Sequence, residues 1–328
     1  MIRKKFPTEI EFEPLQVCNA ACFSCPYSWL KDEKGYTKKR MTLDQIESLL
    51  NDFGKNVREK YNYQGKATII PFRYSDPLIT PFIENIFIIA KKYNLATRIT
   101  TNAKSFNIKK IKIFEKYINQ IEDVISISII GSNKEEVKNF MDIDLDKTLD
   151  SLEFISSNSD LVKSKIKVSL RITRGTEEEY ENLILLQSKL HKFGIANSIM
   201  KKNWMENRLS DYTYKSTESN FVSGCSMFNN KILRRINVMV DGNVVLCDDD
   251  STGRKIFGNI FKTKIDEIWN GKLLNEHNII YNQKYDEKKN NLICNSCSRA
   301  ILKEKFSPYS SVKKIYNKLN SSINEIWN

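Results

Sequence analysis

Residues 18–25, Cys-Asn-Ala-Ala-Cys-Phe-Ser-Cys, hold three cysteines in the spacing C-x3-C-x2-C. So short a segment can direct three thiolate sulfurs at one centre, and such soft ligands suit iron–sulfur clusters and zinc. A four-iron cluster normally takes four cysteine ligands, but no fourth cysteine lies near this segment in the sequence. A [4Fe–4S] cluster on Cys18, Cys22 and Cys25 would therefore leave one iron open to a further ligand.

Spacing alone also leaves open structural zinc or a disulfide framework at the three cysteines. Structural zinc needs a fourth ligand, and the two histidines, His191 and His277, lie far away in the sequence. A disulfide framework needs an oxidising compartment, and the basic start of the chain, Met1–Lys5, lacks the apolar run of a secretory signal. We therefore favour the cluster and expect a cytoplasmic protein.

The composition indicates an ordinary buried core and a basic surface. Of the 328 residues, 41% are hydrophobic, and no apolar run is long enough to cross a bilayer. The net charge of +12 is scattered along the chain without a nucleic-acid-binding motif, so a solvated lysine-rich surface explains most of it. The remainder favours an anionic substrate or a low-potential electron donor such as flavodoxin or ferredoxin. We expect no membrane and no nucleic acid as partners.

Strands and helices alternate through the first 200 residues. Ile10–Glu13 alternates apolar and acidic side chains as a strand does, and Thr42 with Gln45 forms the capping box of a helix. Similar patterns predict strands at 67–72, 95–101, 124–130, 166–173 and 195–200, and helices at 81–93, 108–120, 134–140, 145–156 and 177–193. This alternation is typical of a parallel sheet covered by helices. Because six units are too few for a closed eight-fold barrel, we predict an open, partial (β/α)6 TIM-like barrel.

The carboxyl ends of the strands are where such folds place their active sites. The cysteine segment follows the first strand, as this rule requires. Ser126 and Ser128 alternate with isoleucines in one strand, and Ser169 and Arg171 alternate with aliphatic residues in another. We expect the apolar sets to meet the helices and the polar sets to line the lumen of the barrel, although serines in strands are also tolerated without any role.

Four further cysteines, Cys225, Cys247, Cys294 and Cys297, follow the predicted barrel. Asp241-Gly242-Asn243 between apolar runs predicts a hairpin that returns Cys247 toward the start of its partner strand. Four cysteines suffice for a closed metal site, and on spacing alone either zinc or a cluster fits. We divide the chain into a barrel at 1–200, a connector at 201–220, a small β-hairpin plus helix domain at 221–300 and a C-terminal helix at 301–328, with its helical part at 312–326.

The cysteine segment resembles the signature of the radical S-adenosylmethionine (SAM) enzymes, in which the open iron chelates SAM. Relatives carry a Gly-Gly-Glu-Pro-like turn after the second strand, where this chain has Tyr74-Ser75-Asp76-Pro77, without the glycines. They often carry Thr-Asn-Gly after the third strand, where Thr101-Asn102-Ala103 stands here. The resemblance implies a SAM-binding [4Fe–4S] cluster on Cys18, Cys22 and Cys25. It also implies SAM-binding roles for Ser75, Asp76, Asn102, Ser128 and Arg171.

The region after residue 220 is similar to the SPASM/twitch extension found in one branch of that family. The similarity rests on Gly242-x4-Cys247, Gly258-Asn259-Ile260, Glu267-Ile268-Trp269-Asn270 and the final C-x2-C. It implies that the four later cysteines hold an auxiliary [4Fe–4S] cluster, and this chain has enough cysteines for one such cluster. The same positions would otherwise describe a zinc-stapled interaction protein that is not an enzyme.

The resemblance implies an enzyme that cleaves SAM reductively and abstracts a hydrogen atom from a substrate C–H bond. With three thiolates on one cluster and four on the other, no cysteine is spare to return a hydrogen atom, and Asp248 stands where many relatives have a second cysteine. We therefore favour dehydrogenation over epimerisation. The candidate substrate or proton-handling groups are Glu13, Arg73, Tyr74, Asp248 and Asp250.

The expected substrate is a small polar molecule such as a sugar, an aminocyclitol or a nucleotide sugar. This expectation follows from the start of the chain close to the first strand, since peptide-modifying relatives often carry a leader-binding domain before the barrel. A ribosomally made peptide remains the alternative, because a separate protein can bind the leader.

Overall fold

The computed structural model describes residues 3–32, 38–118, 120–200, 220–225, 233–281, 294, 297 and 300–304, with side chains omitted at 220–225, 279, 281 and 300–304. The chain divides into two compact units. The first comprises residues 1–206 and 231–275, and the second comprises residues 207–230 and 276–328. Of the predicted connector at 201–220, residues 201–219 lie outside the described residues, and so does the predicted helix at 312–326.

The first unit is built on a nine-stranded sheet in the order β10-β9-β8-β1-β2-β3-β4-β5-β6. Strands β1 to β6 run parallel to their neighbours, and the order shows that the sheet does not close on itself. These strands are β1 (Glu9–Phe12), β2 (Thr68–Ile70), β3 (Ala96–Thr101), β4 (Val124–Ile130), β5 (Ile166–Arg171) and β6 (Ala196–Met200). All six predicted strands are present, so the open, partial barrel is confirmed.

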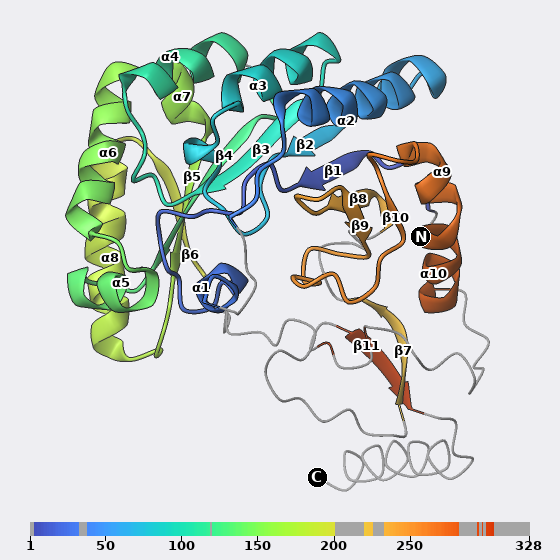
Figure 1. Cartoon of the computed structure of the whole chain (residues 1–328). Coiled ribbons are helices and arrows are strands. Elements are labelled where there is room, and N and C mark those ends of the chain that lie inside the picture. The colour runs from blue at the N-terminus through green and yellow to red at the C-terminus, as the bar shows by residue number, and fades with distance from the viewer. Residues whose placement is uncertain are drawn as a thin grey trace, which may run out of the picture. The chain divides into compact units, whose positions relative to one another are not determined.

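Most of the helices that follow the strands lie along the outer side of the sheet, whereas α1 lies on its inner side (Figure 1). The capping box predicted at Thr42 and Gln45 is present at the start of α2. Two short helical segments, α1 and α7, were not predicted from the sequence. The helices of this part are α1 (Pro26–Leu30), α2 (Leu43–Lys55), α3 (Ile83–Lys92), α4 (Ile108–Tyr117), α5 (Lys134–Met141), α6 (Leu145–Asn158), α7 (Asp160–Lys165) and α8 (Glu177–Lys192).

The apolar core lies between the sheet and these helices. The side chains that β4 and β5 turn to that side are at most 1% exposed: Ile125, Ile127 and Ile129 on β4, and Val168 and Leu170 on β5. The intervening serines of both strands face the other side and are only half buried. The predicted polar lumen is therefore confirmed: the sheet keeps its aliphatic face for packing and leaves a polar face at the centre.

A hairpin extends this sheet beyond β1. Strand β8 (Arg235–Val238) pairs in parallel with β1, and β9 (Asn243–Val245) pairs antiparallel with β8. The hairpin turn needs Gly242 because its φ is +81° and a Cβ there would meet the ring of Phe261 at 2.5 Å. Strand β10 (Gly258–Asn259), α9 (Ile265–Asn270) and the start of α10 (Lys272–Tyr281) complete this region. Because of the β1–β8 pairing, residues 231–275 belong to the first compact unit rather than dividing from it near residue 221.

The second unit contains a two-stranded antiparallel sheet of β7 (Asn220–Cys225) and β11 (Ala300–Glu304). Its register places Cys225 opposite Ala300, three residues after Cys297. Among the helices that the structure describes, none has both the length and the apolar character required to cross a lipid bilayer.

Candidate functional site

The cysteine segment leaves the carboxyl end of β1 and is held against the end of α5. Ala21 N donates to the carbonyl oxygen of Met141 at 3.0 Å, and Phe23 N donates to that of Phe140 at 2.8 Å. The rings of Phe23 and Phe140 meet edge to face. Cys25 is the N-cap residue of α1, directly before a proline. The predicted position of the segment at the carboxyl ends of the strands is therefore confirmed.

An asparagine pair ties the same segment to the end of β3. Asn102 Nδ2 donates to Asn19 Oδ1 at 2.7 Å, and Asn19 Nδ2 donates to Ser105 Oγ at 2.8 Å. Lys104 Nζ reaches the carbonyl oxygen of Asn19 at 3.3 Å. Asn102, which the sequence suggested as a cofactor-binding residue, thus positions the cysteine segment through its side-chain amide.

The three thiols form one local group. Burial raises the pKa of Cys22 to about 12, and the neighbouring Cys25 and Cys18 add to the shift. Burial likewise raises the pKa of Cys18 to about 12. Three half-buried cysteines in mutual range, none of them in a disulfide, could hold three irons of a four-iron cluster, and bound iron would offset the cost of their thiolate charge.

The turn after β2 places Asp76 and Ser75 beside this segment. Asp76 is 2% exposed and accepts hydrogen bonds from Leu78 N, Thr101 Oγ1 and Asn102 N, at 2.8, 2.8 and 3.1 Å. Burial raises the pKa of its carboxyl group, against these three donors. Ser75 Oγ is buried and makes no hydrogen bond within the described part of the chain. A buried hydroxyl without a partner fits a site that awaits a polar ligand.

Ser128 and Arg171 face the lumen from neighbouring strands. Ser128 pairs with Ser169, so Arg171 lies one pleat further along β5 on the same face. Lys167 and Arg98 share this face. Across the described strands β3 to β6, the lumen face carries no acidic side chain; its residues are Ala96, Arg98, Thr100, Val124, Ser126, Ser128, Ile130, Lys167, Ser169, Arg171, Ala196, Ser198 and Met200.

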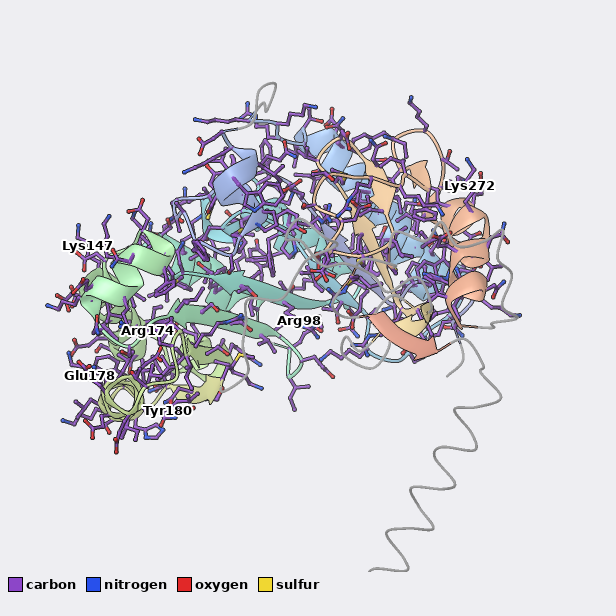
Figure 2. The ribbon with its side chains drawn as sticks, turned by 90° about the horizontal axis from the view of Figure 1, so that it is seen from below. Arg98, Lys147, Arg174, Glu178, Tyr180 and Lys272 are labelled. Carbon is purple, nitrogen blue, oxygen red and sulfur yellow. The ribbon has the colours of Figure 1, made fainter. Side chains whose placement is uncertain are left out.

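Figure 2 shows Arg98 near the centre, among the strands, whereas Lys147 lies at the edge formed by α6 and α8. Arg174, Glu178 and Tyr180 lie at that same edge. Burial lowers the pKa of Arg98, and Glu9 opposes this while Arg235 adds to it. A partly desolvated guanidinium in a polar lumen is well suited to bind an anionic group.

The side of the lumen formed by β1 and β8 holds a buried ion cluster that sequence reasoning missed. Arg235 Nη1 donates to Glu11 at 2.6 Å, and its Nε and Nη2 donate to Glu9 at 2.9 and 2.8 Å. All three residues are at most 7% exposed. The alternating Glu9, Glu11 and Glu13 were visible in the sequence, but their partner lies 226 residues from Glu9 and is brought there by the β1–β8 pairing.

The five candidate substrate or proton-handling residues gather where this ion cluster meets the turn after β2. Glu13 is 3% exposed, and burial raises the pKa of its carboxyl group while Arg73 lowers it. Arg73 and Tyr74 contact the backbone of residues 247–250. Asp248 lies within electrostatic range of Arg73 and Arg235. Asp250 is fully buried and accepts from Arg254 N at 2.9 Å.

The later cysteines fall in both compact units. Cys247 follows β9 in the first unit, where its Sγ and the carboxylates of Asp248 and Asp249 lie within 4.8 Å of one another. In the second unit, Cys297 N donates to the carbonyl oxygen of Cys294 at 3.1 Å, so these two residues share a tight turn. The β7–β11 register sets Cys225 at the strand position beside that turn. Their joint ligation of one cluster stays a prediction.

Residues 225–298 match the family model of the SPASM iron–sulfur cluster-binding domain. No curated protein sequence matches the chain. Among solved structures, BtrN in complex with AdoMet and 2-DOIA is similar over 91% of this chain and 94% of its own, with 16% identity and a TM-score of 0.57. Streptococcus suis SuiB bound to S-adenosylmethionine is similar over 89% and 69%, with 15% identity and a TM-score of 0.55. Native anSMEcpe with bound AdoMet is similar over 89% of this chain and 88% of its own, with 16% identity and a TM-score of 0.52.

Proposed function

We propose that this protein, which has the radical SAM fold and a SPASM iron–sulfur domain, dehydrogenates a small polar substrate that carries an anionic group. The observation that carries the proposal is the group of three half-buried, mutually interacting thiols after the carboxyl end of β1. Bound SAM and its cluster would supply the oxidising power to remove a hydrogen atom from a C–H bond. The chain's own residues hold, orient and shield the reactants.

The residues around the thiols would have three roles: binding the cluster, binding SAM and positioning the cysteine segment. Cys18, Cys22 and Cys25 would hold the cluster. Ser75 Oγ and Asp76 would receive the polar end of SAM, since the hydroxyl is buried and makes no hydrogen bond among the described residues. Ser128 and Arg171 would bind the carboxylate from the lumen face. Asn102 would act on the cysteine segment through Asn19.

The lumen face supports the substrate class. Arg98 and Lys167 lie on the described β3–β6 wall with four serines and one threonine, and no acid lies on that face. A wall of this kind binds sugar hydroxyls by hydrogen bonds and a phosphate or carboxylate by charge. It would disfavour an apolar peptide side chain, because the serine hydroxyls and the cations would be left without hydrogen-bonding or charged partners.

Glu13 is our candidate for the proton acceptor. Its carboxyl group is buried beside Arg73, and a carboxyl whose pKa is raised by burial is a better base near neutrality. Once the substrate has lost a hydrogen atom, Glu13 would take one proton from it, and an auxiliary cluster held by the later cysteines would supply the acceptor for one electron, which together make a two-electron oxidation. The oxidised product then carries a new double bond, such as a carbonyl group.

The first test asks whether the thiols perform the assigned chemistry. Anaerobically reconstituted protein should hold about eight irons per chain, as two four-iron clusters require. With a low-potential reductant and SAM it should release methionine and 5′-deoxyadenosine. Cys22→Ala should abolish this release, whereas Cys294→Ala should keep it. A colourless zinc protein that leaves SAM intact would refute the proposal.

The second test identifies the substrate class. Candidate aminocyclitols, nucleotide sugars and ribosomal precursor peptides, each deuterated at carbon, are incubated with the protein, and deuterium is measured in 5′-deoxyadenosine. We expect transfer from a polar small molecule that carries an anionic group, such as a nucleotide sugar, and Glu13→Gln should keep the transfer but lose the oxidised product. Deuterium transfer from a precursor peptide and from no small molecule would show that the substrate is a peptide. Solvent deuterium on carbon in an epimerised product would replace dehydrogenation by epimerisation.

We also propose a cytoplasmic location and electron delivery by a flavodoxin or ferredoxin, which the basic charge of the chain favours. Reduction by purified flavodoxin should slow as ionic strength rises. A rate independent of salt would argue against this kind of partner.

A further inference from the structure

Two residues of the turn after β2, Arg73 and Tyr74, form hydrogen bonds to the segment that carries Cys247. Arg73 Nη2 donates to the carbonyl oxygens of Cys247, Asp248 and Asp250 at 3.5, 3.4 and 3.1 Å. The hydroxyl of Tyr74 also donates to the carbonyl oxygen of Asp248. Two adjacent residues of the barrel therefore hold one turn that lies 174 residues away in the chain.

The guanidinium group of Arg73 is buried in the interior of the first unit. Its side chain is 0% exposed, and its Nε lies 3.9 Å from the carboxylate of Glu11, which is too far for a hydrogen bond. Nε and Nη1 make no hydrogen bond with any described residue. Moving a cation from water into the protein interior costs roughly several kcal/mol of solvation free energy, unless specific partners offset this cost. The partners that Arg73 does bond are backbone atoms of the Cys247 segment.

The pairing of β9 with β8 and the bond from Asn237 Nδ2 to the carbonyl oxygen of Leu246 at 3.3 Å place the start of the segment, and local bonds give the rest of it its shape. Asp250 N donates to the carbonyl oxygen of Cys247 at 3.3 Å. The carboxylate of Asp250 accepts from Arg254 N at 2.9 Å and from Lys255 N at 3.4 Å. These local contacts all lie within residues 247–255. The bonds from Arg73 and Tyr74 instead tie the segment to β2.

The same turn continues into the SAM side of the site. Asp76 binds the end of β3 through Thr101 Oγ1 and Asn102 N. Asn102 in turn binds Asn19 of the cysteine segment. One hydrogen-bonded path therefore runs from the Cys247 segment through residues 73–76 to the segment of Cys18, Cys22 and Cys25.

We propose that Arg73 is a positioning residue that fixes the Cys247 segment, and so the Cys247 thiolate, relative to the SAM-cluster loop. Tyr74 assists it through its hydroxyl group. The proposal rests on the proposed function, because it takes Cys247 as a ligand of the auxiliary cluster. A Cys247 thiolate fixed relative to this loop would hold the iron that it binds in place to take the electron from the substrate.

The test uses the full chain with Cys18, Cys22 and Cys25 all changed to alanine, so that the iron it retains reports the auxiliary cluster. In this background, Arg73→Lys keeps the charge but replaces the planar fork by a single ammonium group. Tyr74→Phe removes one hydroxyl. Arg98→Met is the matched control, because it removes a half-buried cation of the lumen face rather than one that grips the Cys247 segment. Iron content, the EPR spectrum of the reduced cluster and chelator resistance are measured for each.

We expect Arg73→Lys to lower the chelator concentration that removes half of the iron by about 10-fold, the scale on which residues behind metal ligands act. Its EPR spectrum should shift, Tyr74→Phe should give a smaller change in the same direction, and Arg98→Met should match the parent. If Arg73→Lys and Tyr74→Phe match the parent while Cys247→Ala strips the iron, the positioning role is refuted. If Cys247→Ala leaves the cluster intact, the ligand assignment beneath it fails instead.

Discussion

Replacing Arg235 by methionine should destabilise the first unit strongly, because it leaves two buried carboxylates without their main counter-charge. Arg235 makes three charge-assisted hydrogen bonds, two to Glu9 and one to Glu11. Breaking a buried ion pair by removing one partner costs about 3–5 kcal/mol. We expect a loss of this size at neutral pH, since Arg234 and Arg73 lie at 3.1 and 3.9 Å from the two acids and offset only part of it.

The loss should depend on pH with a definite sign. Burial works to raise the pKa of Glu9, but Arg235 and Arg234 outweigh it, and the net pKa is lowered. In the wild type, this carboxyl group therefore stabilises the fold above its unfolded pKa, and the contribution is lost as pH falls. In Arg235→Met, burial raises the pKa of the same group, so the penalty applies at neutral pH and disappears on protonation. The difference between the two proteins should shrink as pH falls toward about 4.

Urea unfolding at pH 7.5 and pH 5 measures this difference, followed by tryptophan fluorescence, to which the buried Trp269 contributes. The matched variant changes Glu9 and Glu11 to glutamine together with Arg235→Met, which removes the stranded charges. It should recover most of the lost stability, because a buried ion pair is worth little compared with neutral residues of similar volume. Equal losses at both pH values, or no recovery in the triple variant, would refute the reasoning.

Three shorter predictions concern the loops of the site. Ala103 has a left-handed φ of +64°, at the position where relatives often carry glycine. This backbone costs an alanine about 1–2 kcal/mol, so Ala103→Gly should leave the melting temperature nearly unchanged, whereas Ala90→Gly inside α3 should lower it clearly. Asp76→Asn should cost about 1–3 kcal/mol in urea unfolding, because either amide orientation turns an NH2 group toward a backbone N–H; wild-type stability would contradict it. Asn19→Ala should speed loss of the SAM cluster to chelator about 10-fold or more, with Asn51→Ala on α2 as control. Equal rates for the two variants would show that the asparagine pair does not hold the cysteine segment.

Local patterns in the sequence were enough for the barrel. The alternation of β4, with isoleucines on one side and serines on the other, fixed both the strand and its polar face. The capping box at Thr42 located the start of α2 to the residue. The C-x3-C-x2-C spacing located the candidate centre. Each of these signals spans a few residues, and the physics that it reports is equally local: backbone geometry, side-chain period and ligand spacing.

Partnerships between distant segments could not be read in this way. The acids at Glu9 and Glu11 were visible, but Arg235 became their partner only through the parallel pairing of β8 with β1. Arg73 was predicted as a substrate or proton-handling group, and the bonds of its Nη2 to three carbonyl oxygens of the Cys247 segment could be seen only in the structure. Asn102 looked like a cofactor ligand, and its amide binds Asn19. Sequence spacing determines which chemistry a segment can offer, but tertiary register decides which charges and donors meet, because those contacts join residues that are far apart in the chain.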